Sequence, residues 1–271
     1  MARCSTALFL SLHFIYAWWV TDTPANAAEF YAVVERNGSV ALCLSGGSIL
    51  FSDRCAGKGR LTVVEPIKEG TVVWRSAIGT VSLENPPNTQ CPLSHAKWDP
   101  KSEQVISAGR KITKIDRTTL LKRLHRSMLP NVEELIEDDI TAFALDLDND
   151  GEEEIVFVAS NLARVDEQWE RERLADQYER DEKAHPYVTL AGILPKGSDF
   201  PVSFYFDHGD YAGGTDAIGS VTLKGVVSIS PGTGEIALLI RAGTGFDRTQ
   251  SLIRYWHGLL QRIDTIAFTC G

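Results

Sequence analysis

The segment from Ile140 to Ser160 reads ITAFALDLDNDGEEEIVFVAS. Its two ends, ITAFAL and EIVFVAS, are rich in apolar, β-branched and aromatic residues, which favour strands. Between them lies a short acidic stretch that contains Gly151. This order predicts a strand, an acidic loop and a second strand. It leaves open whether the loop holds a metal ion or is only an acidic turn.

The acidic residues of the loop have the spacing of a calcium site. Three aspartates occupy alternate positions, and a glycine follows where the chain must turn sharply. Calcium takes oxygen ligands from positions 1, 3 and 5 of such a loop, from the peptide carbonyl at position 7 and from position 9. Carboxylates this close would repel one another without a cation. The expected ligands of one Ca²⁺ are Asp146, Asp148, Asp150, the carbonyl of Glu152, and Glu154.

The loop differs from an EF-hand, because position 12 is Phe157 instead of glutamate and the flanking segments favour strands over helices. It resembles the DxDxDGxxE/D loops of FG-GAP and VCBS-type repeats, which occur in β-propeller blades of secreted proteins. The likeness to small exported FG-GAP-like proteins extends over roughly residues 140–271 and includes GDYAGGTDAIGSVTLKGV and the ending FTCG. It implies an exported calcium-binding β protein.

A second copy of the loop pattern lacks the metal ligands. In GVVSISPGTGEIALLIRAG, Gly232 and Glu235 stand where the first loop has Gly151 and Glu154. Apolar residues and a proline occupy the three aspartate positions. The segment therefore predicts a strand-turn-strand repeat without an ion, with a chance match of common residues as the alternative.

Most other segments also favour strands. YAVVER and SVALCL flank Asn37-Gly38, a hairpin signal because both turn residues must take positive φ. After Pro186, strand-like runs are separated by turns rich in glycine and aspartate: YVTLAGIL, PVSFYF, GSVTLKGVVSI, EIALLIRAG and SLIRYWHGLLQRI. The expected fold is mainly β, with antiparallel sheets in a propeller-like or sandwich-like arrangement and one or two helical insertions.

Two segments favour helices. In the first, from Asp116 to Met128, four apolar side chains recur at helical spacing. The second, residues 164–183, is densely charged and places acids four residues before bases, as a solvated surface helix does, although a partner-binding helix is the alternative. The apolar faces of the two helices would consist of Leu120, Leu121, Leu124 and Met128, and of Val165, Trp169 and Tyr178.

The first residues of the chain have the features of a removed export signal. A largely apolar run from Ser5 to Val20 follows a basic residue and precedes Ala25-Asn26-Ala27, which has the small-x-small form of a cleavage site. The run is shorter than the roughly 20 apolar residues of a spanning helix, with a retained anchor as the alternative. We expect a secreted or periplasmic protein that is not inserted in a membrane after signal removal.

The sequence divides into three expected parts. These are the signal peptide at 1–27, a β-rich region at 28–115, and a calcium-loop region at 116–271 that carries the charged helical insertion at 164–183. The formal net charge of −9 argues against nucleic acid and anionic lipid as partners, because both would repel the protein.

The cysteines that follow the expected signal suggest disulfides, since thiols oxidise outside the cytoplasm. Four cysteines allow three pairings, of which we favour Cys43 with Cys55 and Cys91 with Cys270. A zinc site is the rival interpretation, but the CxxC spacing typical of such sites is missing.

One further segment, FDHGDYAGGTD, gathers residues able to act in acid–base chemistry: Asp207, His208, Asp210 and Asp216. Adjacent residues of a strand point to opposite faces, so Asp207 and His208 need not cooperate. The sequence has no nucleophile elbow, HExxH motif or glycine-rich phosphate loop. We therefore expect no catalytic residues and a module that binds an unidentified protein or glycan. The alternative is an exported hydrolase that uses the Asp207-His208-Asp210 region.

Overall fold

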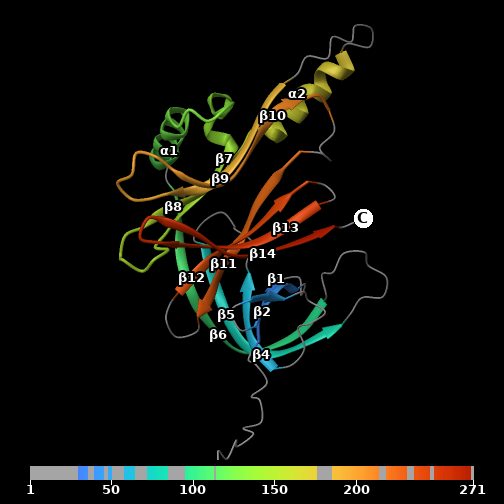
Figure 1. Cartoon of the computed structure of the whole chain (residues 1–271), viewed down its shortest axis with the longest axis vertical. Coiled ribbons are helices and arrows are strands. Elements are labelled where there is room, and N and C mark those ends of the chain that lie inside the picture. Colours follow the sequence, from blue (N-terminus) through green and yellow to red (C-terminus); the bar gives the residue numbers. More distant parts are fainter. Residues whose placement is uncertain are drawn as a thin grey trace, which may run out of the picture.

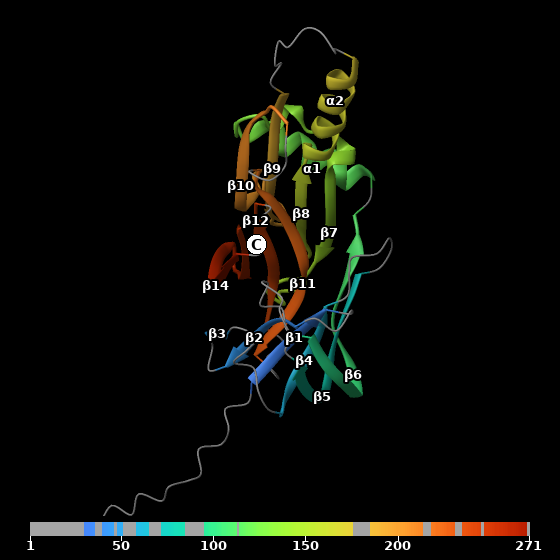
Figure 2. The ribbon, with the colours of Figure 1, turned by 90° about the vertical axis from the view of Figure 1, so that its right-hand side faces the viewer.

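The computed structural model of the protein contains two β-sheets with helices against one of them (Figure 1, Figure 2). Several predicted features fall outside the residues that the structure describes: the expected signal peptide, the Asn37-Gly38 turn and three of the four cysteines. The side chain of Cys43 is not described either. The disulfides therefore stay a prediction. The described residues are 30–35, 40–45, 48–50, 58–64, 72–84, 95–112, 114–175, 185–213, 218–230, 235–244 and 247–269.

Ten strands form one long sheet, and every neighbouring pair is antiparallel except β1 and β4. They lie side by side in the order β10-β9-β8-β7-β6-β5-β4-β1-β2-β3. The strands are β1 (Phe30–Glu35), β2 (Val40–Ser45), β3 (Ser48–Leu50), β4 (Lys58–Val64), β5 (Val72–Glu84), β6 (His95–Lys111), β7 (Ile140–Leu145), β8 (Glu154–Ser160), β9 (His185–Leu194) and β10 (Val202–Tyr211).

Strand β6 joins the first half of the long sheet, β1 to β5, to the second half, β7 to β10. Most of β6 pairs with β5, and its last residues, Arg110 and Lys111, pair with Ala144 and Phe143 of β7. The sheet is therefore continuous past residue 115, where the sequence suggested a boundary between regions.

The second sheet is an antiparallel meander of four strands that packs on β7, β8 and β9. Side chains of a strand alternate between its two faces, so Phe143 and Leu145 of β7 face the second sheet while Ala142 and Ala144 face the helices. Two open sheets packed face to face confirm a mainly β fold of the sandwich-like kind. The meander consists of β11 (Ser220–Ser230), β12 (Glu235–Gly243), β13 (Asp247–Trp256) and β14 (Leu259–Thr269).

Helix α1 (Lys114–Arg126) covers the opposite face of the long sheet. Leu120 and Leu124 are fully buried there, as their helical spacing predicted. Met128, predicted on the same face, is 92% exposed. The prediction was wrong at this residue because the helix ends at Arg126 and Met128 takes a left-handed φ of 57°, so its side chain no longer continues the apolar face of the helix. Two short 3₁₀ turns, Val132–Glu134 and Glu137–Asp139, connect α1 to β7.

The charged insertion forms helix α2 (Leu162–Ala175), which packs on β9 through a narrow apolar edge. Val165 is buried, and the ring of Trp169 meets Tyr211 edge to face at 6.1 Å between centroids. The Tyr211 hydroxyl also donates a hydrogen bond to Asp166. Tyr178 lies outside the described residues. Neither helix in the described part of the chain is long and apolar enough to cross a membrane.

The run SLIRYWHGLLQRI is not one strand, as the sequence suggested, but the tip of a hairpin. Its chain reverses at His257 and Gly258, whose φ angles are 48° and 82°. Positive φ at both turn residues matches the right-handed twist of the flanking strands. Because apolar residues flank the turn closely on both sides, the sequence pattern did not reveal that the chain reverses here. The hairpin places His257 beside the acidic loop.

Candidate metal centre

The acidic loop connects β7 to β8, which pair as an antiparallel hairpin from Ile140 opposite Ala159 to Leu145 opposite Glu154. Both strands are largely buried between the second sheet and α1. The predicted strand-loop-strand is thus confirmed, and the buried strands hold both ends of the loop in place.

Local hydrogen bonds shape the turn inside the loop. The carboxylate of Asp146 accepts hydrogen bonds from the backbone N–H groups of Asp150 and Gly151, at 3.2 and 3.1 Å. Asn149 and Gly151 have φ angles of 58° and 88°, in the region that favours asparagine and glycine. The sequence DNDG therefore supplies both the acceptor and the residues that this tight turn needs.

Three carboxylates of the loop come together. One oxygen from each of Asp146, Asp148 and Glu154 can be chosen so that all three lie within 4.8 Å of one another. Calcium binds oxygens at about 2.3–2.6 Å, so two ligands of one ion are at most about 5 Å apart. The spacing of the three oxygens therefore fits a single calcium ion.

Asp148 has one satisfied and one unsatisfied oxygen. Its side chain is only 3% exposed. Oδ2 accepts a hydrogen bond from the backbone N–H of His257 at 3.0 Å, whereas buried Oδ1 has no hydrogen-bond partner. A buried carboxylate oxygen without a donor is costly, and a bound cation would satisfy it. The structure of this residue thus fits a metal ligand better than a purely structural acidic turn.

Glu154 is also buried, at 3% exposure, and one of its oxygens accepts a hydrogen bond from the N–H of Leu147 at 2.9 Å. Burial is the main cause that raises the pKa of Glu154 to about 7; the Leu147 hydrogen bond opposes this rise, and the charges of Asp148 and Asp150 add to it. The ionised form of Glu154 is therefore disfavoured where it stands. A divalent cation at the cluster would reverse this preference.

The two remaining predicted ligands lie toward solvent. The carboxylate of Asp150 is outside the group of three and accepts a hydrogen bond from the N–H of Glu152 at 2.8 Å. The side chain of Glu152 forms an ion pair with Lys196, which leaves its peptide carbonyl as the group predicted to bind the ion. The structure thus brings together three of the four predicted carboxylate ligands.

The N–H of His257 is a part of the site that the sequence pattern does not reveal. It comes from the β13–β14 turn, 109 residues away from Asp148 in the chain. The imidazole Nδ1 lies 3.9 Å from the same oxygen. A backbone donor has no residue-type signature, so only the packing of the second sheet on the first reveals it.

The second copy of the loop pattern falls on two paired strands, and its turn, residues 231–234, lies outside the described residues. β11 continues to Ser230 and β12 starts at Glu235, in antiparallel pairing. Val227, at the position that corresponds to Asp146, stays in the strand and is buried. Glu235 binds Arg254, with 2.7 Å between Oε1 and Nη2. An apolar residue such as Val227 gains more from strand pairing and burial than it would in an open loop.

The candidate acid–base residues of β10 do not form a joint site among the described residues. Asp207 accepts hydrogen bonds from the Tyr187 hydroxyl at 3.4 Å and from the Gly219 N–H at 2.9 Å. The exposed ring of His208 lies beside Phe206, with 5.0 Å between ring centroids. Asp207 thus has a structural role between the sheets. Asp216 lies outside the described residues.

Comparisons with known proteins found no match to this chain among protein-family models, curated proteins or solved structures.

Proposed function

We propose that the protein is an exported calcium-binding β protein that acts by binding a protein or glycan, with the ion in a structural role. The observation that carries the proposal is the buried Asp148 Oδ1, which has no hydrogen-bond partner and belongs to a carboxylate grouped with Asp146 and Glu154. The expected ligands are these three carboxylates together with Asp150 and the Glu152 carbonyl. Oxygen ligands of this kind and number suit calcium better than magnesium, which keeps several waters.

The function of the ion would be to hold the loop in one conformation. It would relieve the repulsion among the loop carboxylates and compensate the burial of Asp148 and Glu154. The resemblance to FG-GAP and VCBS loops supports calcium, and the pattern of residues 1–27 supports export. A secreted or periplasmic protein would meet calcium at concentrations that weak extracellular sites require.

Calcium should stabilise the purified protein by a measurable amount. With a dissociation constant of about 0.1 mM and about 1 mM free calcium, binding adds roughly 1.4 kcal/mol to the free energy of unfolding. For a domain of this size the melting temperature would rise by about 3–6 °C. Thermal melts in calcium and in chelator, with calorimetric titration of ion-free protein, measure both quantities.

Two variants test the assignment of the site. Asp148→Ala should abolish the calcium-dependent shift, because it removes the ligand whose oxygen lacks any other partner. Glu235→Ala, in the metal-free copy, should leave the shift intact even if it lowers the melting temperature by breaking the Arg254 ion pair. An unchanged melting temperature in chelator, with no heat of binding up to several millimolar calcium, would show that the loop is only an acidic turn.

A further inference from the structure

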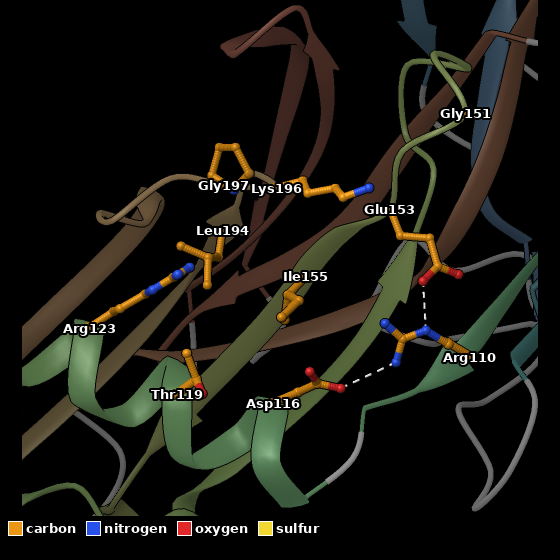
Figure 3. Close-up of a pocket in the computed structure, with 11 residues that line it drawn as sticks. Arg110, Asp116, Thr119, Arg123, Gly151, Glu153, Ile155, Leu194, Lys196 and Gly197 are labelled. Carbon is orange, nitrogen blue, oxygen red and sulfur yellow. Dashed lines mark hydrogen bonds and ion pairs between the residues drawn. The ribbon is translucent and has the colours of Figure 1, made fainter.

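A pocket of about 620 Å³ lies beside the acidic loop, on the α1 side of the long sheet (Figure 3). Its volume is within the range of about 300 to 1,000 Å³ that small-ligand sites have. Helix α1, the end of β6, the acidic loop and the turn after β9 form its walls. Among the side chains that line it, Arg123 belongs neither to the calcium site nor to the apolar core.

The floor of the pocket is apolar. Ile155 and Leu194 are paired neighbours on β8 and β9, and Figure 3 shows both at the centre of the pocket. Leu194 is only 2% exposed, so the half-buried Ile155 provides the accessible apolar surface. Polar side chains surround this small patch on the remaining sides. Such a combination suits a ligand with one apolar face and polar groups around its rim, as a sugar ring has.

Two of the three basic side chains that line the pocket form ion pairs with acidic residues. Arg110 donates to Glu153 at 2.6 Å and to Asp116 at 3.3 Å, so it is held between two walls. Lys196 pairs with Glu152 at the rim. Arg123, which points from α1 toward Leu194, has no acidic partner among the described residues. Its guanidinium is therefore the group able to bind a carboxylate of a ligand through two parallel hydrogen bonds.

The anions of the pocket limit the charge of that ligand. Asp116 and Glu153 line the pocket and would repel a phosphate or sulfate with two negative charges or more. Both carboxylates can accept hydrogen bonds from hydroxyl groups, and the hydroxyl of Thr119 can donate or accept one. We propose that the pocket binds a uronic-acid unit of a glycan, with its carboxylate on Arg123 and its apolar ring face on Ile155.

The site would depend on calcium, and this part rests on the proposed function. Gly151 and Glu153 belong to the acidic loop and also line the pocket. An ion that orders the loop would fix Glu153 and, through it, Arg110. Coupling of this kind is reciprocal, so uronate should raise the affinity for calcium by the same factor as calcium raises the affinity for uronate.

The test is calorimetric titration of the full protein, at saturating calcium, with D-glucuronate, with a disaccharide that contains it and with neutral D-glucose. We expect glucuronate to bind at least about tenfold more tightly than glucose, because a hydrogen bond between charged groups contributes that much. Tighter binding of the disaccharide would identify a glycan as the source, and equal binding would identify the free sugar acid. Equal affinity for glucuronate and glucose, or no binding at about 10 mM, would overturn the proposal.

Variants separate the pocket from the ion. Arg123→Gln should weaken glucuronate binding about tenfold or more and leave the calcium-dependent melting shift intact. Arg171→Gln, on the exposed side of α2, is the matched control and should change neither. Undiminished glucuronate binding by Arg123→Gln would refute the carboxylate assignment. Glucuronate binding without any calcium-dependent melting shift would instead refute the calcium site and its coupling to the pocket, because the melting shift is measured in the absence of glucuronate.

Discussion

Asp148 shows how one residue can link a local loop to the rest of the protein. Its Oδ2 is fixed by the N–H of His257, while Oδ1 is buried without a donor. An unsatisfied buried polar group costs about 1–3 kcal/mol, and more when it is charged. Folding of the ion-free loop therefore carries a cost that a cation would remove. The loop turn itself is stabilised separately, through Asp146.

Gly151→Ala should weaken calcium binding, because Gly151 has φ +88° in the turn that brings the carboxylates together. An added Cβ would meet no atom within 4 Å, so the effect comes from backbone strain alone. We expect a loss of about 1–2 kcal/mol in stability, measured by urea unfolding. Gly197→Ala is the matched control, with φ +71° and equally open space. It should show similar strain with unchanged calcium affinity in calorimetry, and equal affinity losses in both variants would contradict the assignment.

At the scale of elements, α1 is held on the sheet by a few fully buried leucines. Leu124→Ala should lower the free energy of unfolding by about 2–5 kcal/mol, because it leaves a cavity between the helix and the sheet. Met128→Ala should change it by less than about 0.5 kcal/mol, since that side chain is exposed. Urea unfolding followed by circular dichroism measures both. Similar losses in the two variants would show that the helix packs differently.

The contact between β9 and β10 predicts a loss of stability at high pH. Burial, and then the charge of Asp207, raise the pKa of Tyr205 to about 12, and the pKa of neighbouring Tyr187 is raised by the same two causes. An unfolded tyrosine has a pKa of about 10. The stabilising contribution of Tyr205 is therefore complete below pH 10 and is lost as pH rises from about 10 to 12. In Tyr205→Phe, the free energy of unfolding measured with urea should fall less steeply between pH 10 and 12 than in the parent protein. An equally steep fall would show that other groups cause the loss of stability.

At the scale of the whole molecule, the acidic loop connects the two sheets. The β7–β8 hairpin belongs to the long sheet, and His257 belongs to the hairpin at the end of the second sheet. Their hydrogen bond joins residues 109 positions apart. A change in the order of the loop should therefore alter the local stability of both sheets.

Calcium should slow hydrogen exchange in two separate segments. We expect protection of the loop amides at 147–153 and of the His257 amide, by up to about tenfold if binding contributes roughly 1.4 kcal/mol. Peptides from α2, which packs on β9 away from the loop, serve as the internal control and should not change. Protection in the loop without protection at His257 would mean that Asp148 does not transmit the order of the loop to the second sheet.

Features that depend on local residue spacing can be predicted from the sequence alone. Runs of apolar, β-branched and aromatic residues predict the strands, because such side chains pack well on a pleated sheet, and helical spacing predicts the burial of Leu120 and Leu124. The order Asp-x-Asp-x-Asp-Gly predicts both the turn and the candidate ligands, because neighbours in a loop of this length must lie close together.

Which of these groups lie close together, and which other residues contact them, depends on the tertiary structure. It separates Asp150 from the other carboxylates, provides the N–H of His257, and brings Arg110, Arg123 and Lys196 around one pocket. It also ends α1 before Met128 and divides the last apolar run into two strands at His257. Contacts between distant segments depend on how whole sheets pack, and the free energy of that packing is a sum over many residues that no local pattern contains.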